Sequence, residues 1–284
     1  MRRLLLIGLP LSLQTFFCWA FRSVDQTAVA TTFPMVDLGF FTFTKQCLSM
    51  GVLLVINLML VLYPSLWSEL ERAETPQALG PKIRRLLCWF FLSTCALVSF
   101  AQAAFGAFVY WVVPNYAPTV GLFERLAFLL ALGTIQNVPG YLLLSTTINR
   151  QSAVTVAWGC GLALYSGVIA WVIRAGWGLT GVALCSVAAH AMISIALLAL
   201  AHRYIVTGWR SGLSLYGWLS GLLLVTVAVF ALYQLGPFSY GGTSPVAAVL
   251  VLRAALAAAV WGALAWVVWR GGWSGVLSRL EAGG

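Results

Sequence analysis

Eight long apolar runs with hardly any charged residues constrain the fold of this chain most strongly. In a bilayer each backbone N–H and C=O must find a partner within its own segment, so a run of about 20 apolar residues predicts a spanning helix. With 61% hydrophobic and only 8% charged residues, the chain cannot be a water-soluble globule. The sequence therefore predicts an all-α, polytopic membrane helix bundle. The expected spans are 4–21, 40–63, 86–109, 122–146, 153–173, 179–201, 214–235 and 245–269.

The cations between these spans predict the orientation of the bundle. Eight spans place both termini on one side of the membrane, and most of the Lys and Arg residues lie on that side. By the positive-inside rule, the N- and C-termini are both predicted to be cytoplasmic. The net charge of +9 then reflects orientation and contact with anionic membrane lipids rather than nucleic-acid binding. The cytoplasmic cations are Arg2, Arg3, Arg72, Lys82, Arg84, Arg85, Arg150, Arg203, Arg210, Arg270 and Arg279, and the opposite side carries Arg22 and Arg174.

The first thirty residues allow a second interpretation. Two arginines, an apolar stretch and Ala28–Val29–Ala30 together resemble a secretory signal with a small-residue cleavage site. Bulky aromatic residues close the apolar run, however, and the polar stretch from Arg22 to Thr27 is long for a cleavage region. Cleavage would leave an odd number of spans and move the C-terminus across the membrane.

No sequence pattern indicates an enzyme, a cofactor or a metal site. The six cysteines fall inside expected helices without a C-x-x-C pair, which is typical of small apolar side chains in a core. His190 and His202 each lack a second ligand at helical spacing. The sequence contains neither a Gly-rich phosphate loop nor a G-x-S-x-G elbow, and the longest expected connection, 64–85, is short.

Ionisable residues near or within the expected spans are the candidate site. A charge at the centre of a membrane helix costs about 2.5 kcal/mol or more unless it faces a cavity or a partner. Arg22 and Asp25 lie at the outer end of the first span, Lys45 lies a little inside the second, and Glu124 and Arg125 open the fourth. All five can line one outward-facing vestibule. Alternatively, Arg22 pairs with Asp25 at i and i+3, and Glu124 neutralises a neighbouring cation.

Two cations lie within spans without a carboxylate nearby in the sequence. Lys45 either extends outward to the membrane surface or points inward with Gln46 and Asn57, where it would offer donors to an anionic ligand. Arg253, within the eighth span, can contact lipid phosphate, a partner helix or another cavity.

Amide side chains mark the middle of the fourth span. Gln136 and Asn137 are followed by Pro139, which removes a backbone hydrogen bond and is expected to loosen the helix there. The two amides can contact a substrate beside this hinge, or they can hydrogen-bond neighbouring helices.

Several short motifs follow one another in order along residues 1–205. A helix that begins G-x-P at Gly8–Pro10 reaches the polar end Arg22–Asp25, and a leucine–glycine–aromatic step starts the next helix at Leu38–Phe40. In order and spacing these motifs resemble one six-helix lobe of the oligosaccharide flippases in the multidrug/oligosaccharidyl-lipid/polysaccharide exporter superfamily. The further matching segments are Tyr63–Leu70, Val113–Pro118, Asn149–Arg150 and Gly176–Ala183.

The resemblance implies a transporter of the bacterial inner membrane without covalent chemistry. Such a protein moves a polyprenyl-pyrophosphate-linked oligosaccharide to the outer leaflet for the synthesis of cell-surface polysaccharide such as lipopolysaccharide. Arg22, Lys45 and Arg125 would then bind the pyrophosphate, and Asp25 would orient Arg22 or take part in ion coupling. The predicted substrate-binding residues are Arg22, Asp25, Lys45, Gln46, Glu124, Arg125, Gln136 and Asn137.

The chain departs from this family in having one lobe, 1–205, followed by two additional helices in 206–284. Complete members have two lobes, so the departure indicates a truncated gene, a chain that pairs with itself or with another half, or a divergent protein that no longer flips lipids. A G-x-x-x-G pattern at Gly217–Gly221 can dimerise helices. Two other functions stay open, namely a membrane-embedded glycan polymerase or ligase, and a non-transporting scaffold. The short outer segments argue against the enzyme.

Overall fold

The computed structural model describes residues 2–72, 75–145, 147–206, 209–235, 238–240 and 245–270. Within these ranges all regular structure is helical, and no strand occurs. The predicted all-α class is confirmed, and seven helical segments are long and apolar enough to cross a membrane, which indicates a multi-pass membrane protein. The orientation of the termini stays a prediction. The seven segments are Met35–Val61, Gln77–Val112, Thr119–Leu144, Gln151–Arg174, Gly178–Ile205, Gly212–Tyr233 and Val246–Trp266.

The first two helices are longer than the sequence predicted. Helix α1 (Arg2–Thr32) continues through most of the expected outer loop 22–39, and α2 (Met35–Arg72) begins directly after a turn at Phe33 and Pro34. The polar side chains in this part of α1 do not stop the helix, because hydroxyls such as that of Ser23 donate to carbonyls of the preceding turn. Helix α1 is not among the seven candidate spans. The expected loop 22–39 is therefore wrong.

By contact, the chain divides into two compact units, and the three boundaries between them, after Pro76, Ala131 and His202, each fall inside a helical element. Unit 1 comprises Met1–Pro76 and Leu132–His202, and unit 2 comprises Gln77–Ala131 and Arg203–Gly284. These units are defined by contacts between helices and not by likeness to a family. The division into a flippase-like lobe over 1–205 and two additional helices in 206–284 therefore stays a prediction.

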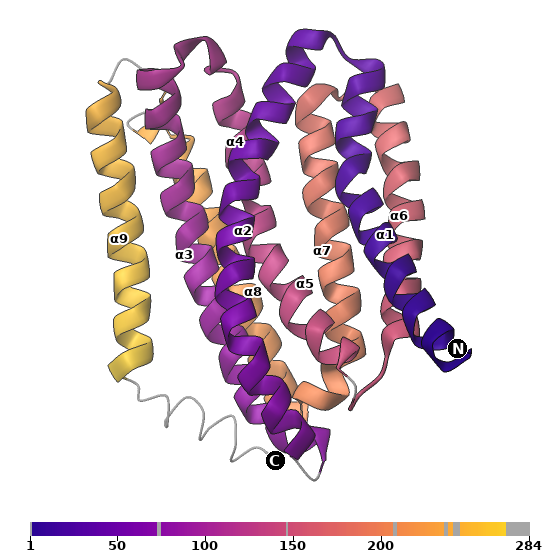
Figure 1. Cartoon of the computed structure of the whole chain (residues 1–284). Helices are drawn as coiled ribbons and strands as arrows, with labels where there is room; N and C mark the ends of the chain where they lie inside the picture. Colours follow the sequence, from indigo (N-terminus) through magenta and orange to yellow (C-terminus); the bar gives the residue numbers. More distant parts are fainter. Residues whose placement is uncertain are drawn as a thin grey trace. The chain divides into compact units, whose positions relative to one another are not determined.

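In unit 1, helix α1 packs along α6 (Gln151–Arg174), and both helices run in the same direction (Figure 1). Helices α1 and α2 meet at their turn and diverge away from it in the same view. The unit also contains most of α5 (Phe128–Leu144) and of α7 (Gly178–Ile205). The turn between α6 and α7 has Gly176 and Gly178 at φ +74° and +64°, a backbone conformation that glycine adopts without strain.

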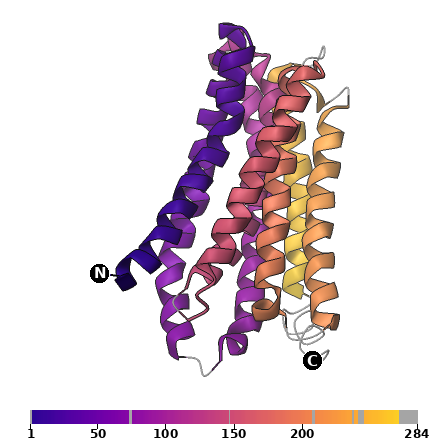
Figure 2. The same cartoon turned by 90° about the vertical axis from the view of Figure 1, so that its right-hand side faces the viewer.

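In unit 2, helix α3 (Gly80–Val112) is central, and α8 (Trp209–Tyr233) and α9 (Val246–Arg270) both pack against it. Figure 2 shows α8 and α9 as long helices in the orange and yellow part of the chain. A buried cluster of Ala103, Val229 and Tyr233 joins α3 to α8. The shorter elements are η1 (Pro76–Leu79), η2 (Pro114–Tyr116) and α4 (Thr119–Leu126).

The fourth expected span is interrupted at a different residue from the one predicted. The α-helix is interrupted at Ala127, between α4 and α5, where the backbone N–H of Leu130 donates to the carbonyl of Ala127. This i to i+3 bond is a local 3-10 step. Pro139, which was expected to loosen the helix, lies inside α5, and the helix continues past it to Leu144.

Candidate functional site

A buried carboxylate in unit 1 binds a lysine on the neighbouring helix. The ammonium of Lys45 in α2 lies 2.8 Å from Oδ2 of Asp25 in α1, 20 positions earlier in the chain. The helical hairpin that turns at Phe33 and Pro34 brings the two side chains together. The Asp25 side chain is 1% exposed, whereas that of Lys45 is 17% exposed. The pair is therefore buried from the carboxylate side and open on the lysine side.

The Asp25 carboxylate has further donors besides Lys45. Its Oδ2 also accepts a hydrogen bond from the hydroxyl of Ser186 in α7 at 3.0 Å, and its Oδ1 accepts one from the backbone N–H of Gln26 at 2.8 Å. The Lys45 ammonium points in addition toward the backbone carbonyl of Arg22, at 3.5 Å. Three helices thus converge on one anion.

An aromatic layer closes the buried side of this ion pair. The hydroxyl of Tyr165 in α6 is buried close to Asp25 and Ser186, yet it forms no hydrogen bond of ordinary length and angle with any of the described residues. Nδ1 of His190 is 2.8 Å from the carbonyl oxygen of Ser186. The rings of Phe21 and His190 pack edge to face, with their centroids 4.9 Å apart. We call these five residues the Asp25 centre: Asp25, Lys45, Tyr165, Ser186 and His190.

Other predicted site residues of unit 1 lie around the Asp25 centre rather than within it. Asp25 pairs with Lys45, so the alternative pairing with Arg22 at i and i+3 is wrong, and the Arg22 side chain is exposed. Gln46 and Asn57 are also exposed, so Lys45 does not point inward together with them. Successive helical positions lie about 100° apart around the axis, so Gln46 faces away from the side that Lys45 occupies.

The amides of α5 have different surroundings. Gln136 is buried and donates from Nε2 to the carbonyl of His190 at 2.9 Å, which links α5 to α7. From the sequence, Gln136 was expected either to contact a substrate or to hydrogen-bond a neighbouring helix, and this contact is the hydrogen bond to a neighbouring helix. Asn137 is half-buried. Gln136 therefore supports the backbone that carries His190.

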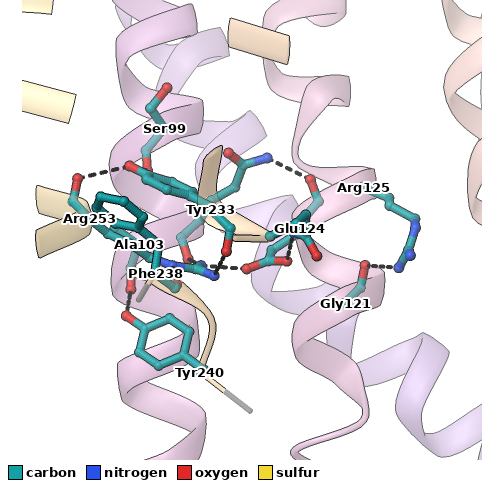
Figure 3. A network of polar contacts seen from close by, with 11 residues as sticks. Ser99, Ala103, Gly121, Glu124, Arg125, Tyr233, Phe238, Tyr240 and Arg253 are labelled. Atoms are coloured by element: carbon teal, nitrogen blue, oxygen red, sulfur yellow. Dashed lines mark hydrogen bonds and ion pairs between the residues drawn. The ribbon is translucent and has the colours of Figure 1, made fainter. Parts of the chain in front are cut away.

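Unit 2 contains a second buried ion pair (Figure 3). Nη1 of Arg253 in α9 lies 2.5 Å from Oε1 of Glu124 in α4, and neither side chain is more than 5% exposed. The other nitrogens of the guanidinium are also bound, because Nε donates to the carbonyl of Phe238 at 2.6 Å and Nη2 to that of Tyr233 at 2.9 Å. Gln234 donates to Oε2 of Glu124 at 2.8 Å. Arg253 thus has a partner helix, which was one of its three predicted contacts.

Two tyrosine rings complete this network. The rings of Tyr233 and Tyr240 have their centroids 4.6 and 4.4 Å from the guanidinium carbon of Arg253. The Tyr240 hydroxyl donates to the carbonyl of Ala103, and its ring occupies the space where Gly106 lacks a side chain. Burial raises the pKa of Tyr240 above its ordinary value although the Arg253 guanidinium acts in the opposite direction, so the hydroxyl remains a donor at neutral pH. We call these five residues the Arg253 network: Glu124, Tyr233, Gln234, Tyr240 and Arg253.

The five residues of the predicted vestibule divide between the two units. Arg22, Asp25 and Lys45 belong to unit 1, whereas Glu124 and Arg125 belong to unit 2. Arg125 is half-buried, and its Nη1 donates to the carbonyl of Gly121 one turn earlier, at 2.6 Å. Their joint lining of one vestibule stays a prediction.

Sequence reasoning missed Ser186 and Tyr165 and left His190 without a role. Ser186 and His190 lie four residues apart on one face of α7, and this spacing of polar side chains within an apolar span is the signal that could have found them. Among the described residues no three His, Cys, Asp or Glu side chains gather in a way that could hold a metal.

No family model, no curated protein and no solved structure matches this chain.

Proposed function

We propose that this protein is a membrane transporter of the flippase type, which moves a polyprenyl-pyrophosphate-linked oligosaccharide across the bacterial inner membrane for the synthesis of cell-surface polysaccharide. The resemblance of the motifs along residues 1–205 and the seven apolar helices support this proposal. The observation that carries it is the open side of the Asp25 centre. There a lysine in an apolar helix is 17% exposed, and its ammonium lies 3.5 Å from the backbone carbonyl of Arg22, whose side chain is exposed.

Binding of the substrate would begin with an exchange of partners at Lys45. In the structure the ammonium is neutralised by Asp25 at 2.8 Å, so a pyrophosphate must compete with this carboxylate. Phosphate oxygens form strong charge-assisted hydrogen bonds with ammonium and guanidinium groups, and Arg22 supplies the second cation. The substrate anion would therefore be held between Lys45 and Arg22.

The buried side of the centre can compensate for the loss of Lys45 from Asp25. Ser186 already donates to the carboxylate, and the Tyr165 hydroxyl, which has no hydrogen-bond partner among the described residues, lies beside it. Rotation of that hydroxyl would supply a replacement donor.

Translocation in proteoliposomes tests this function. The assay would follow a fluorescent polyprenyl-pyrophosphate oligosaccharide from one leaflet to the other, with Lys45→Met and Arg22→Gln as the test variants. Arg72→Gln is the matched control, because Arg72 is an exposed cation at the end of α2. We expect translocation to be lost in both test variants although both remain folded, and to persist in the control.

Two results would contradict the proposal. One is translocation at the parent rate in both test variants. The other is a loss of translocation that is caused only by unfolding of the variant. The double variant Asp25→Asn/Lys45→Met would reveal this case, because it removes both charges of the ion pair together. It would then restore both stability and translocation. That second result favours a scaffold, in which the two charges serve only to hold helices together.

We further propose that transport needs a second lobe and that another copy of this chain can supply it. The G-x-x-x-G face of α8 supports a helix contact, because a Cβ atom added at Gly217 or Gly221 would meet no atom within 4 Å. Native mass spectrometry in detergent would test this contact. We expect a dimer that Gly221→Leu dissociates, whereas a parent chain that is monomeric under all conditions would exclude self-pairing.

A further inference from the structure

A groove of about 620 Å³ runs along unit 1 between α1 and α6. Both helices end on the same side of the unit, with Thr32 as the last residue of α1 and Arg174 as the last of α6 (Figure 1). Arg174, Thr31 and Thr32 therefore line one end of the groove, and Trp19 and Leu162 line the other. The groove is cationic at one end, and the rest of its length is lined mostly by apolar side chains with the hydroxyls of Ser23, Thr27 and Ser166 among them.

The cation at the polar end is Arg174, the last residue of α6. Arg174 is exposed, and among the described residues no carboxylate forms an ion pair with it. It also lies at the end of a helix that is apolar enough to cross a membrane. The end of a helix that crosses a membrane is expected at the depth of the lipid headgroups, where a guanidinium can bind phosphate in a bidentate manner.

The hydroxyl groups along the groove offer acceptors rather than donors. Thr31 donates to the carbonyl of Thr27 at 3.0 Å, Thr32 donates to that of Ala28 at 2.5 Å, and Ser166 donates to that of Leu162 at 2.8 Å. Because each hydroxyl proton is already in a hydrogen bond to a helix carbonyl, the lone pairs of the hydroxyl oxygens remain available as acceptors. A ligand headgroup that fits must be anionic at Arg174 and must carry its own hydroxyl or ammonium donor beside it.

A second groove on the opposite side of α6 provides a contrast. It lies between α6 and α7, has a volume of about 380 Å³, and is lined by apolar side chains such as Val168, Leu184 and Met192. The rings of Trp171 and Trp177 also line it and meet edge to face, with centroids 5.5 Å apart. No charged residue lines this second groove, so it offers no site for a phosphate.

We infer that the α1/α6 groove binds an anionic phospholipid of the surrounding bilayer. The phosphate contacts the guanidinium of Arg174, and the headgroup donor contacts the hydroxyl oxygens of Thr31 and Thr32. An acyl chain follows the apolar part of the groove past Ile169 toward Trp19. The volume lies within the range of roughly 300–1,000 Å³ that is usual for sites of small molecules. This site does not depend on the proposed transport function.

Native mass spectrometry of the full chain in detergent tests this site with phosphatidylglycerol and phosphatidylcholine as probes. We expect phosphatidylglycerol to bind more tightly, because its headgroup is anionic and carries hydroxyl donors. Arg174→Gln should weaken its binding about tenfold, the usual effect of losing a hydrogen bond to a charged group. Arg150→Gln changes an exposed cation at the other end of α6 and should leave the affinity almost unchanged.

A matched pair of steric variants separates the two grooves. Ala170 lines the α1/α6 groove and Ala188 lines the α6/α7 groove, and both are exposed. We expect Ala170→Phe to reduce phosphatidylglycerol binding and Ala188→Phe to leave it intact. Because Arg174 is exposed, Arg174→Gln provides a second test that does not depend on how Ala170→Phe folds.

Three results would overturn the inference. Equal losses in Arg174→Gln and Arg150→Gln would indicate unspecific attraction of anionic lipid to cations at the membrane surface. Displacement of phosphatidylglycerol by millimolar inorganic phosphate would indicate a site for the free anion. Equal losses in Ala170→Phe and Ala188→Phe would indicate that the lipid does not prefer the α1/α6 groove. None of these results bears on translocation, so this inference and the proposed function can fail separately.

Discussion

The Asp25 centre and the Arg253 network both bury an ion pair among apolar helices, yet they differ in how completely the two charges are bound. In the Arg253 network all three guanidinium nitrogens and both carboxylate oxygens have partners. In the Asp25 centre Lys45 is partly exposed, and the neighbouring Tyr165 hydroxyl has no partner among the described residues. A fully bound pair fixes helices in place, whereas an incompletely bound pair can change partners. This difference assigns a structural role to the first and makes the second the candidate site.

The largest effect is expected from breaking the Arg253 network. Arg253→Met leaves Glu124 buried without its cation, and removal of one partner from a buried ion pair typically costs about 3–5 kcal/mol. Thermal unfolding in detergent, followed by circular dichroism, would measure this loss. The double variant Glu124→Gln/Arg253→Met should recover part of the stability. A single variant as stable as the parent protein would show that the network is not structural.

A smaller effect is expected where Tyr240 covers Gly106. A Cβ atom at this position would lie 2.1 Å from the tyrosine ring, so Gly106→Ala must displace the ring from the guanidinium of Arg253. Overpacking of this kind costs about 1–3 kcal/mol. Gly167→Ala is the matched control, because a Cβ atom there meets nothing within 4 Å. Equal melting temperatures for the two variants would mean that the Tyr240 contact does not constrain the fold.

The Asp25 centre should tolerate the loss of its cation better than the Arg253 network does. Lys45→Met leaves the Asp25 carboxylate with Ser186 and the backbone N–H of Gln26, so we expect a loss of about 1–3 kcal/mol. The variant should nevertheless fold and lose translocation. The comparison between the two pairs breaks down if Lys45→Met destabilises the protein as strongly as Arg253→Met in the same unfolding measurement.

The smallest effect on its own is expected for Tyr165→Phe. Removal of a buried hydroxyl without a partner is nearly neutral for stability, because no hydrogen bond is lost. The same change should be costly in the Lys45→Met background, where the hydroxyl is needed by Asp25. A double-mutant cycle of unfolding free energies measures this coupling, and strictly additive effects would exclude Tyr165 as the replacement donor.

The sequence predicts most of the helices because hydropathy is a local property. Each expected span overlaps a helix, since a segment that must satisfy its own backbone groups in lipid reveals itself by composition alone. The loop expected over 22–39 is wrong because polar side chains do not by themselves end a helix. Ser and Thr hydroxyls can donate to carbonyls of their own helix, as Ser23 and Thr31 do. Pro34 marks the actual turn, because proline fits the start of a helix better than its interior.

The partners of the buried charges could not be predicted in the same way. Arg253 binds Glu124 from 129 positions earlier, and Ser186 reaches Asp25 from 161 positions later, so no window of sequence contains both members. Such pairs depend on which helices pack together, and the packing of helices is a property of the tertiary structure that no local sequence pattern contains. The pairing of Asp25 with Lys45 is different, because 20 positions and one turn suffice to bring them together once 22–32 is taken as helix.

The binding of inorganic pyrophosphate to the purified protein tests the central claim most directly, because it asks whether Asp25 competes for Lys45. Isothermal titration would compare the parent with Asp25→Asn and with Glu124→Gln. Our account predicts that Asp25→Asn binds pyrophosphate about tenfold more tightly, since one charge-assisted contact no longer has to be broken, while Glu124→Gln leaves the affinity unchanged. Unchanged affinity in Asp25→Asn, or an equal gain in Glu124→Gln, would contradict the distinction between an exchangeable and a structural ion pair.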